Sequence, residues 1–145
     1  MTHKLFFYIC LCMSLICMTA QAERKLTKIE FEKLAHDFGT IYEKDGNATC
    51  TFRFTNAGKT PLVIIRAQAS CGCTVPTYPT QPIAPGESGE IKVVYKAKNR
   101  PGEFVKNVFV YSNTKPDRTV LQIKGVVLPD NNEDETAEMP SAVLK

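Results

Sequence analysis

The sequence is poor in the features that most enzymes share. It has two histidines among 145 residues, and one of them is His3. Ser70 and Ser88 belong to no nucleophile motif, and the acidic residues are scattered or gathered near the C-terminus. His36 and Asp37 are adjacent, and neighbouring residues of a strand point to opposite faces, so they do not form half of a catalytic dyad. The sequence therefore predicts no catalytic residues and a protein that is not an enzyme.

The sequence also lacks any stretch with a helical period and any apolar run as long as the roughly 20 residues that a membrane-spanning helix needs. The apolar stretch from Leu5 to Ala20 covers 16 residues, follows the basic Lys4 and precedes the small residues Ala20 and Ala22. This arrangement is typical of a secretory signal peptide, which we expect at residues 1–22 with cleavage after Ala22.

Two other interpretations of this N-terminal stretch compete with cleavage after Ala22. A retained membrane anchor is disfavoured because the stretch is short and contains Ser14 and Thr19. A lipoprotein signal at Cys17 is disfavoured because the bulky Ile16 precedes that cysteine. We therefore expect an exported protein, periplasmic or secreted, with no stable membrane insertion after cleavage of the signal.

Removing the 22 residues of the signal from 145 leaves 123, enough for one compact domain. Three of the six cysteines leave with the signal, and Cys50, Cys71 and Cys73 remain. Export places these thiols in an oxidising compartment, where at most one disulfide can form within the chain. Cys50 shares an alternating pattern with Phe52 and Phe54, so we expect it to be a small buried core residue.

Charge divides the mature chain into a basic body and an acidic tail. Residues 23–129 contain 16 Lys plus Arg against 10 Asp plus Glu, whereas residues 130–145 contain five acids and one lysine. The lysines of the body alternate with apolar residues, which indicates solvated strand faces and no nucleic-acid partner. We expect a polar N-terminal segment at residues 23–28 and a disordered acidic tail at residues 129–145.

Alternating apolar and polar residues predict strands throughout residues 29–128. The first strand, at Ile29 to Phe31, is expected to be an edge strand or a returning strand. The run from Pro61 to Ile65 is the most apolar, and we expect a central strand packed on both faces. Four prolines between Val75 and Pro85 predict a loop that crosses the surface. Further strands are expected at residues 48–55, 91–96, 104–112 and 121–127, with Val108 and Val110 on one face and Phe109 and Tyr111 on the other. About seven strands joined by Gly, Pro and Asn turns predict an all-β, antiparallel β-sandwich of the immunoglobulin-like kind.

Several phrases of the sequence also occur together, in this order, in a known family. They are HDFGTI (36–41), FRFTNAGK (52–59), PLVI (61–64), SCGCT (70–74), PIAPGESG (82–89), YSN (111–113) and KG (124–125). On these phrases the chain resembles the DUF1573 family of exported bacterial proteins, which is common in Bacteroidetes. The resemblance implies an immunoglobulin-like β-sandwich in the periplasm or outside the cell. It implies no catalytic residue, because the family is one of unknown function.

The Cys71-Gly72-Cys73 motif is the most specific part of the resemblance and the main concentration of chemistry in the chain. In an extended backbone both sulfurs would project to the same side, within reach of each other. They could form a small structural disulfide, which we expect to be strained, or an exchangeable redox pair. They could instead bind zinc or Cu(I), although the mature chain offers only His36, Cys50 and Met139 as further soft ligands, or form a disulfide with another protein.

The sequence favours a non-enzymatic immunoglobulin-like module that binds an unidentified protein partner in the cell envelope. This hypothesis depends on the signal, on the strand pattern and on the missing catalytic constellation, and a binding role follows only by analogy of fold. We predict no cofactor, no metal site and no small-molecule ligand. The alternative is a periplasmic thiol-redox or metal-handling protein that acts through Cys71 and Cys73.

Overall fold

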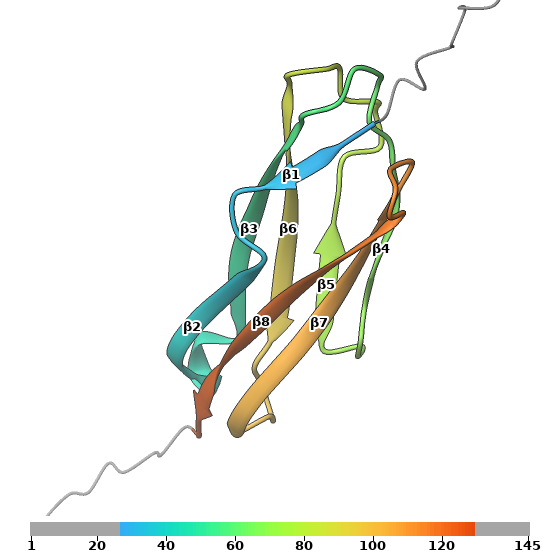
Figure 1. The fold of residues 1–145 in the computed structure, drawn as a ribbon. Coiled ribbons are helices and arrows are strands. Elements are labelled where there is room, and N and C mark those ends of the chain that lie inside the picture. Colours follow the sequence, from blue (N-terminus) through green and yellow to red (C-terminus); the bar gives the residue numbers. More distant parts are fainter. Residues whose placement is uncertain (1–26, 130–145) are drawn as a thin grey trace, which may run out of the picture.

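The computed structural model describes residues 27–129, which form a β-sandwich (Figure 1). The signal peptide predicted for residues 1–22 and the acidic tail from residue 130 lie outside the described residues. Helical structure within the described region is confined to one 3₁₀ turn, η2 (Glu43–Asp45). No helix of this region is long and apolar enough to cross a membrane.

Two four-stranded sheets make up the sandwich (Figure 1). The first sheet has the order β1 (Ile29–Phe31), β3 (Asn47–Asn56), β6 (Ser88–Lys96) and β5 (Thr74–Thr77). The second sheet has the order β2 (Ala35–Tyr42), β8 (Arg118–Leu128), β7 (Gly102–Ser112) and β4 (Ile64–Ala69). The predicted all-β sandwich is confirmed, with eight strands in place of about seven. Its sheets are not purely antiparallel, because β2 pairs with β8 in parallel.

The core lies between the sheets and contains the apolar members of the alternating strands. Phe52 and Phe54 of β3 and Ile91 of β6 are fully buried. From the second sheet, Val108 and Leu121 are equally inaccessible. The alternation that predicted these strands therefore reflects the burial of one face of each sheet, with the polar positions turned to solvent.

The expectation of a central strand at residues 61–65 is wrong. Leu62 makes only an isolated bridge to Ile83, and β4 begins at Ile64 and lies at the edge of the second sheet. Leu62 and Ile64 are buried, whereas Ile65 is 60% exposed next to a register shift. The run therefore alternates between buried and outward positions like its neighbours, and its outward residues happen to be apolar.

The proline-rich segment is a loop only in part. Its first residues form β5, which contains Pro76 and pairs with β6 along one side only. A proline is compatible with an edge strand because its missing N–H can face away from the ladder. The predicted first strand is confirmed as the edge strand β1.

Candidate functional site

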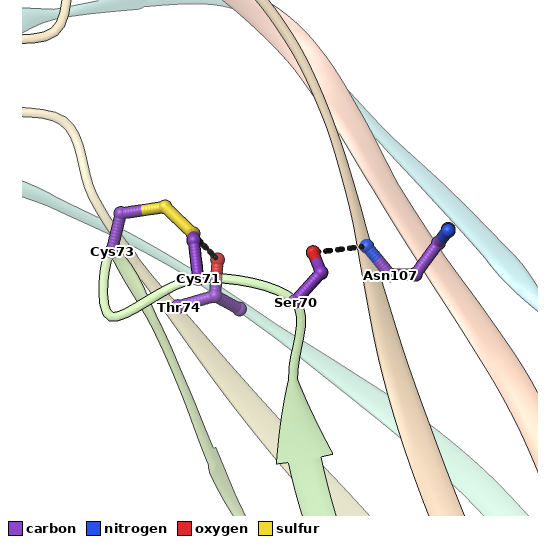
Figure 2. The surroundings of a disulfide bond; sticks show 5 residues. All are labelled: Ser70, Cys71, Cys73, Thr74 and Asn107. Carbon is purple, nitrogen blue, oxygen red and sulfur yellow. Dashed lines mark hydrogen bonds between the residues drawn. A yellow bond between two sulfur atoms is a disulfide. The ribbon is translucent and has the colours of Figure 1, made fainter.

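The Cys71-Gly72-Cys73 motif forms the turn between β4 and β5, so it carries the chain from the second sheet to the first. Cys71 and Cys73 are joined by a disulfide, with 5.3 Å between their Cα atoms (Figure 2). The sequence analysis assumed an extended backbone at this motif, but the structure has a turn. The Thr74 N–H donates a hydrogen bond of 3.3 Å to the Cys71 carbonyl, and this bond closes the turn.

Backbone hydrogen bonds fix the turn to both sheets. The Ser70 N–H donates to the Asn107 carbonyl of β7 at 2.9 Å, and the Asn107 N–H donates to Ser70 Oγ at 3.2 Å (Figure 2). On the other side, the Lys96 N–H of β6 donates to the Cys73 carbonyl at 2.8 Å. None of these bonds involves a sulfur atom, so the turn has its own support beside the disulfide.

The disulfide itself can add little to the stability of the fold. It closes a loop of three residues, and loop closure of that length removes only about 1.6 kcal/mol of unfolded-state entropy, against about 3 kcal/mol for 15 residues. A structural role alone is therefore a weak explanation for this pair.

The hydroxyl of Thr74 lies beside both sulfur atoms. Its Oγ1 is 3.6 Å from Cys71 Sγ and 3.7 Å from Cys73 Sγ. A disulfide sulfur carries no proton, so the hydroxyl is the donor. Thr74 is 4% exposed, and Figure 2 shows its hydroxyl hydrogen-bonded to the Cys71 sulfur inside the turn.

The disulfide borders an open cleft of about 450 Å³, here called the sulfur cleft. Its lining includes Cys71, Cys73, Tyr95, Arg100, Phe104 and Lys106. The Tyr95 ring of β6 stacks on the Phe104 ring of β7, with 3.9 Å between centroids and 10° between planes. Burial raises the pKa of the Tyr95 phenol, and the positive charge of Arg100 opposes this effect. The sulfur cleft thus combines a disulfide, an aromatic pair from both sheets and two cationic side chains.

The other predicted soft ligands do not gather at the disulfide. Cys50 is a buried free thiol on β3, as the alternation predicted, and burial raises its pKa to about 11. His36 lies on β2, where its ring contacts Phe38, and Met139 lies outside the described residues. Within residues 27–129, no group of three or more His, Cys, Asp or Glu side chains could hold a metal ion.

A second feature, which the sequence analysis did not find, lies on the outer face of the second sheet. Arg66, Tyr111 and Arg118 pair side by side across β4, β7 and β8. The Arg66 guanidinium lies 4.0 Å from the centroid of the Tyr111 ring, and the Arg118 guanidinium lies 5.7 Å from that of Phe109. Val120, which is 39% exposed, pairs with Phe109 in the adjoining row. We call these five residues the arginine–aromatic face.

Sequence reasoning placed Phe109 and Tyr111 on one face of their strand but attached no function to them. The arginines come from two other strands, and they meet the aromatic rings only through non-local pairing. No local signal in the sequence could have brought these side chains together.

Comparison with known proteins agrees with the fold. A family model described as "Protein of unknown function (DUF1573)" matches residues 29–127, which confirms the resemblance drawn from the motifs. No curated protein matches the chain significantly.

Solved structures with the same fold come from distant proteins. One is a protein of unknown function from Porphyromonas gingivalis W83, with a TM-score of 0.61, 13% identity, and coverage of 76% of this chain and 51% of that one. The VesB protease of Vibrio cholerae has a TM-score of 0.56 and 13% identity, covering 68% of this chain and 31% of the protease. A PapD-like domain of human CEP192 has a TM-score of 0.52 and 11% identity, covering 76% of this chain and 92% of that domain. The chain thus spans about half of the first structure and a third of the second, and these likenesses show the fold alone.

Proposed function

The chain belongs to the DUF1573 family, and from this premise we propose that it is an exported, non-enzymatic immunoglobulin-like module that binds another protein of the cell envelope. The fold is compatible with an interaction module, because sandwiches present broad, rigid sheet faces. The single observation that supports the proposal is the arginine–aromatic face. The signal-like N-terminus supports export.

The arginine–aromatic face has the composition of an interface centre. Arg and Tyr dominate the residues that contribute most to binding, and aromatic side chains and Arg are enriched at interfaces. Stacking of Arg66 on Tyr111 holds a long side chain in place, so less conformational entropy is lost when a partner binds. The face is also supported by three paired strands, which favours a preformed docking surface.

The outer face of the first sheet offers a useful contrast. The outward residues of β3 are Thr49, Thr51, Arg53 and Thr55. Arg53 is already paired with Glu90 of β6 at 3.0 Å, so its charge is neutralised locally. This face has no aromatic side chain on β3 or β6 and serves as an internal control for binding experiments.

Charge indicates the chemistry of the partner. Arg66 and Arg118 flank the aromatic rings and are exposed, and neither makes a salt bridge within the described residues. A protein with carboxylates around an apolar centre would satisfy both the guanidinium groups and Val120. We therefore propose that an acidic protein surface occupies this face.

Site-specific photo-crosslinking in intact cells tests the proposal. A photoreactive residue in place of Val120 should form an adduct with a second protein, whereas the same residue in place of the exposed Lys92 on the first sheet should not. Adding Arg66→Ala and Arg118→Ala should abolish the adduct, and the control pair Lys92→Ala and Lys96→Ala should leave it. Equal adducts from both positions, no adduct, or an adduct only with the chain itself would refute the proposal.

A further inference from the structure

We propose that the Cys71–Cys73 disulfide is a thiol–disulfide exchange site. In this proposal, a thiolate of a dithiol protein attacks Cys71 Sγ. Thr74 is a positioning residue, and its hydroxyl stabilises the departing Cys73 thiolate. The inference concerns the sulfur cleft and does not depend on the arginine–aromatic face, so either can fail alone.

Access to the two sulfurs differs, and this difference selects the point of attack. Both cysteines line the open sulfur cleft, but Cys73 is only 7% exposed and belongs to the core cluster, whereas Cys71 is half-buried at its border. An incoming thiolate must approach a sulfur along the disulfide bond. Cys71 is therefore the reachable sulfur and Cys73 the leaving group.

Thr74 is placed to stabilise the leaving group. Its Oγ1 lies 3.7 Å from Cys73 Sγ. Thr74 and Cys73 are only 4% and 7% exposed, so a hydrogen bond to an anion there has little competition from water. A hydrogen bond to the charged form favours that form and makes the thiol a better leaving group. The same hydroxyl lies 3.6 Å from Cys71 Sγ, so it can serve whichever sulfur becomes anionic.

The charges of the cleft act in the same direction. Arg100 and Lys106 both line it, against the single acid Glu103. Nearby cations stabilise thiolates and attract an attacking thiolate. No helix N-terminus or histidine lines the cleft, so the hydroxyl and these two cations are the groups that can activate the pair.

The turn can release the disulfide without losing its shape. Ser70, Cys73 and Thr74 are held by backbone hydrogen bonds to β7, to β6 and within the turn. Reduction breaks none of these bonds. Exchange therefore needs no unfolding of the sandwich.

The exchange takes place in two substitution steps. First, a partner thiolate attacks Cys71 Sγ, a mixed disulfide forms, the Cys71–Cys73 bond breaks, and the Cys73 thiolate takes up a proton from solvent. Then the second thiol of the partner loses its proton and attacks the partner's first sulfur, the one bonded to Cys71 Sγ in the mixed disulfide. Cys71 leaves as a thiolate and is protonated. The partner dithiol is oxidised to a disulfide by two electrons, and Cys71 and Cys73 are reduced to thiols.

Stoichiometric exchange with the small dithiol dithiothreitol tests access. The full exported chain is mixed with dithiothreitol at pH 7.5, quenched with a maleimide, and the peptide that contains Cys71 and Cys73 is measured by mass spectrometry, so that other cysteines do not interfere. We expect reduction of the folded protein with a rate proportional to dithiothreitol concentration. A rate that is independent of dithiothreitol and equals the rate of global unfolding would overturn the proposal.

Variants of Thr74 separate a positioning role from a structural one. Thr74→Val should slow reduction about tenfold, because the departing thiolate loses its hydrogen-bond donor. Thr74→Ser keeps the hydroxyl and should restore the rate, and the exposed Thr49→Val should leave the rate unchanged. Equal behaviour of Thr74→Val and wild type would remove the role of Thr74, and equal losses in Thr74→Val and Thr74→Ser would show that its contribution is packing.

Single-cysteine variants test the point of attack. With oxidised glutathione, Cys73→Ser leaves the accessible Cys71 and should form a mixed disulfide at least tenfold faster than Cys71→Ser, which leaves the buried Cys73. Equal rates, or faster reaction of Cys73, would contradict the assignment of Cys71. Circular dichroism of each variant shows whether the sandwich is intact when the rates are compared.

Discussion

The three cysteines of the described region differ in exposure and in bonding, because Cys71 and Cys73 form a disulfide and Cys50 is a free thiol. Cys50 and Cys73 are only 6% and 7% exposed among core side chains, whereas Cys71 is half-buried at the border of the sulfur cleft. The raised pKa of Cys50, to about 11, leaves only about one thiolate in a thousand at pH 8. Burial therefore decides which sulfur can react.

This difference predicts that Cys50 is inert in the folded protein. Its alkylation by iodoacetamide at pH 8 should follow the rate of global unfolding, and urea concentrations beyond the unfolding midpoint should expose it fully. Peptide mass spectrometry gives the rate for Cys50 separately from the other cysteines. Fast alkylation of Cys50 under native conditions would show that the core opens without global unfolding.

A second prediction at the residue scale concerns Gly89. A Cβ atom at this position would lie 2.6 Å from Cζ of Phe54 and 2.8 Å from Cδ1 of Ile83, both in the core. Gly89→Ala should lower the free energy of unfolding by about 1–3 kcal/mol, because the packed rings must move. Gly72→Ala is the matched control, because its Cβ would meet nothing within 4 Å, and urea unfolding should separate the two.

At the scale of elements, β2 shows how a local irregularity is stabilised. Its pairing with β8 shifts register between Asp37 and Thr40, and Gly39 has φ of 62° at that point. The Gly39 N–H donates to Asp37 Oδ1 at 2.8 Å, and Lys124 of β8 pairs with the same carboxylate at 3.2 Å. The backbone bond to Gly39, followed by the interaction with Lys124, lowers the pKa of Asp37.

The sign of this shift sets a pH dependence. Because the folded pKa lies below the unfolded one, the carboxylate stabilises the fold above its ordinary pKa of 3.8, and the contribution is lost as pH falls through the folded pKa. Asp37→Asn should therefore be less stable than wild type at pH 7, and the difference should shrink at the lowest pH at which both still fold. Urea unfolding at several pH values, with the exposed Glu32→Gln as control, checks this; a difference that grows on acidification would contradict it.

The alternation of apolar and polar residues was sufficient to predict most strands, but not which strands pair with one another. Alternation identified β3, β6, β7 and β8 because each has one buried face. The edge position of β4, the parallel pairing of β2 and the strand that contains Pro76 depend on hydrogen bonds to distant residues. The Cys71-Gly72-Cys73 motif was visible in the sequence, whereas the cleft beside it required Arg100, Phe104 and Lys106 from another strand and its preceding turn.

At the scale of the whole molecule, we expect the sandwich to fold without its disulfide. The variant Cys71→Ser with Cys73→Ser should keep its β-sheet circular dichroism and lose about 1.6 kcal/mol of unfolding free energy at most, because the closed loop has three residues. Thermal and urea unfolding measure the loss. Failure of this variant to fold would mean that the disulfide is a structural requirement after all.

Export is the second prediction for the whole chain. Fractionation of cells should place the protein outside the cytoplasm, and the isolated chain should begin at Glu23, because Ala20 and Ala22 provide the small-residue cleavage site. Mass spectrometry of the intact protein checks the start. A chain that retains Met1, or that begins at a lipid-modified Cys17, would correct the signal prediction.

The most direct measurement is the affinity of the purified chain for the partner captured at Val120. Replacing both Arg66 and Arg118 by Ala should weaken binding by tenfold or more, since each arginine of an interface centre is worth about 1–2 kcal/mol. Replacing both Cys71 and Cys73 by Ser should leave that affinity unchanged. An unchanged affinity in the arginine variant, or an equal loss in the cysteine variant, would show that the arginine–aromatic face is not the surface that binds.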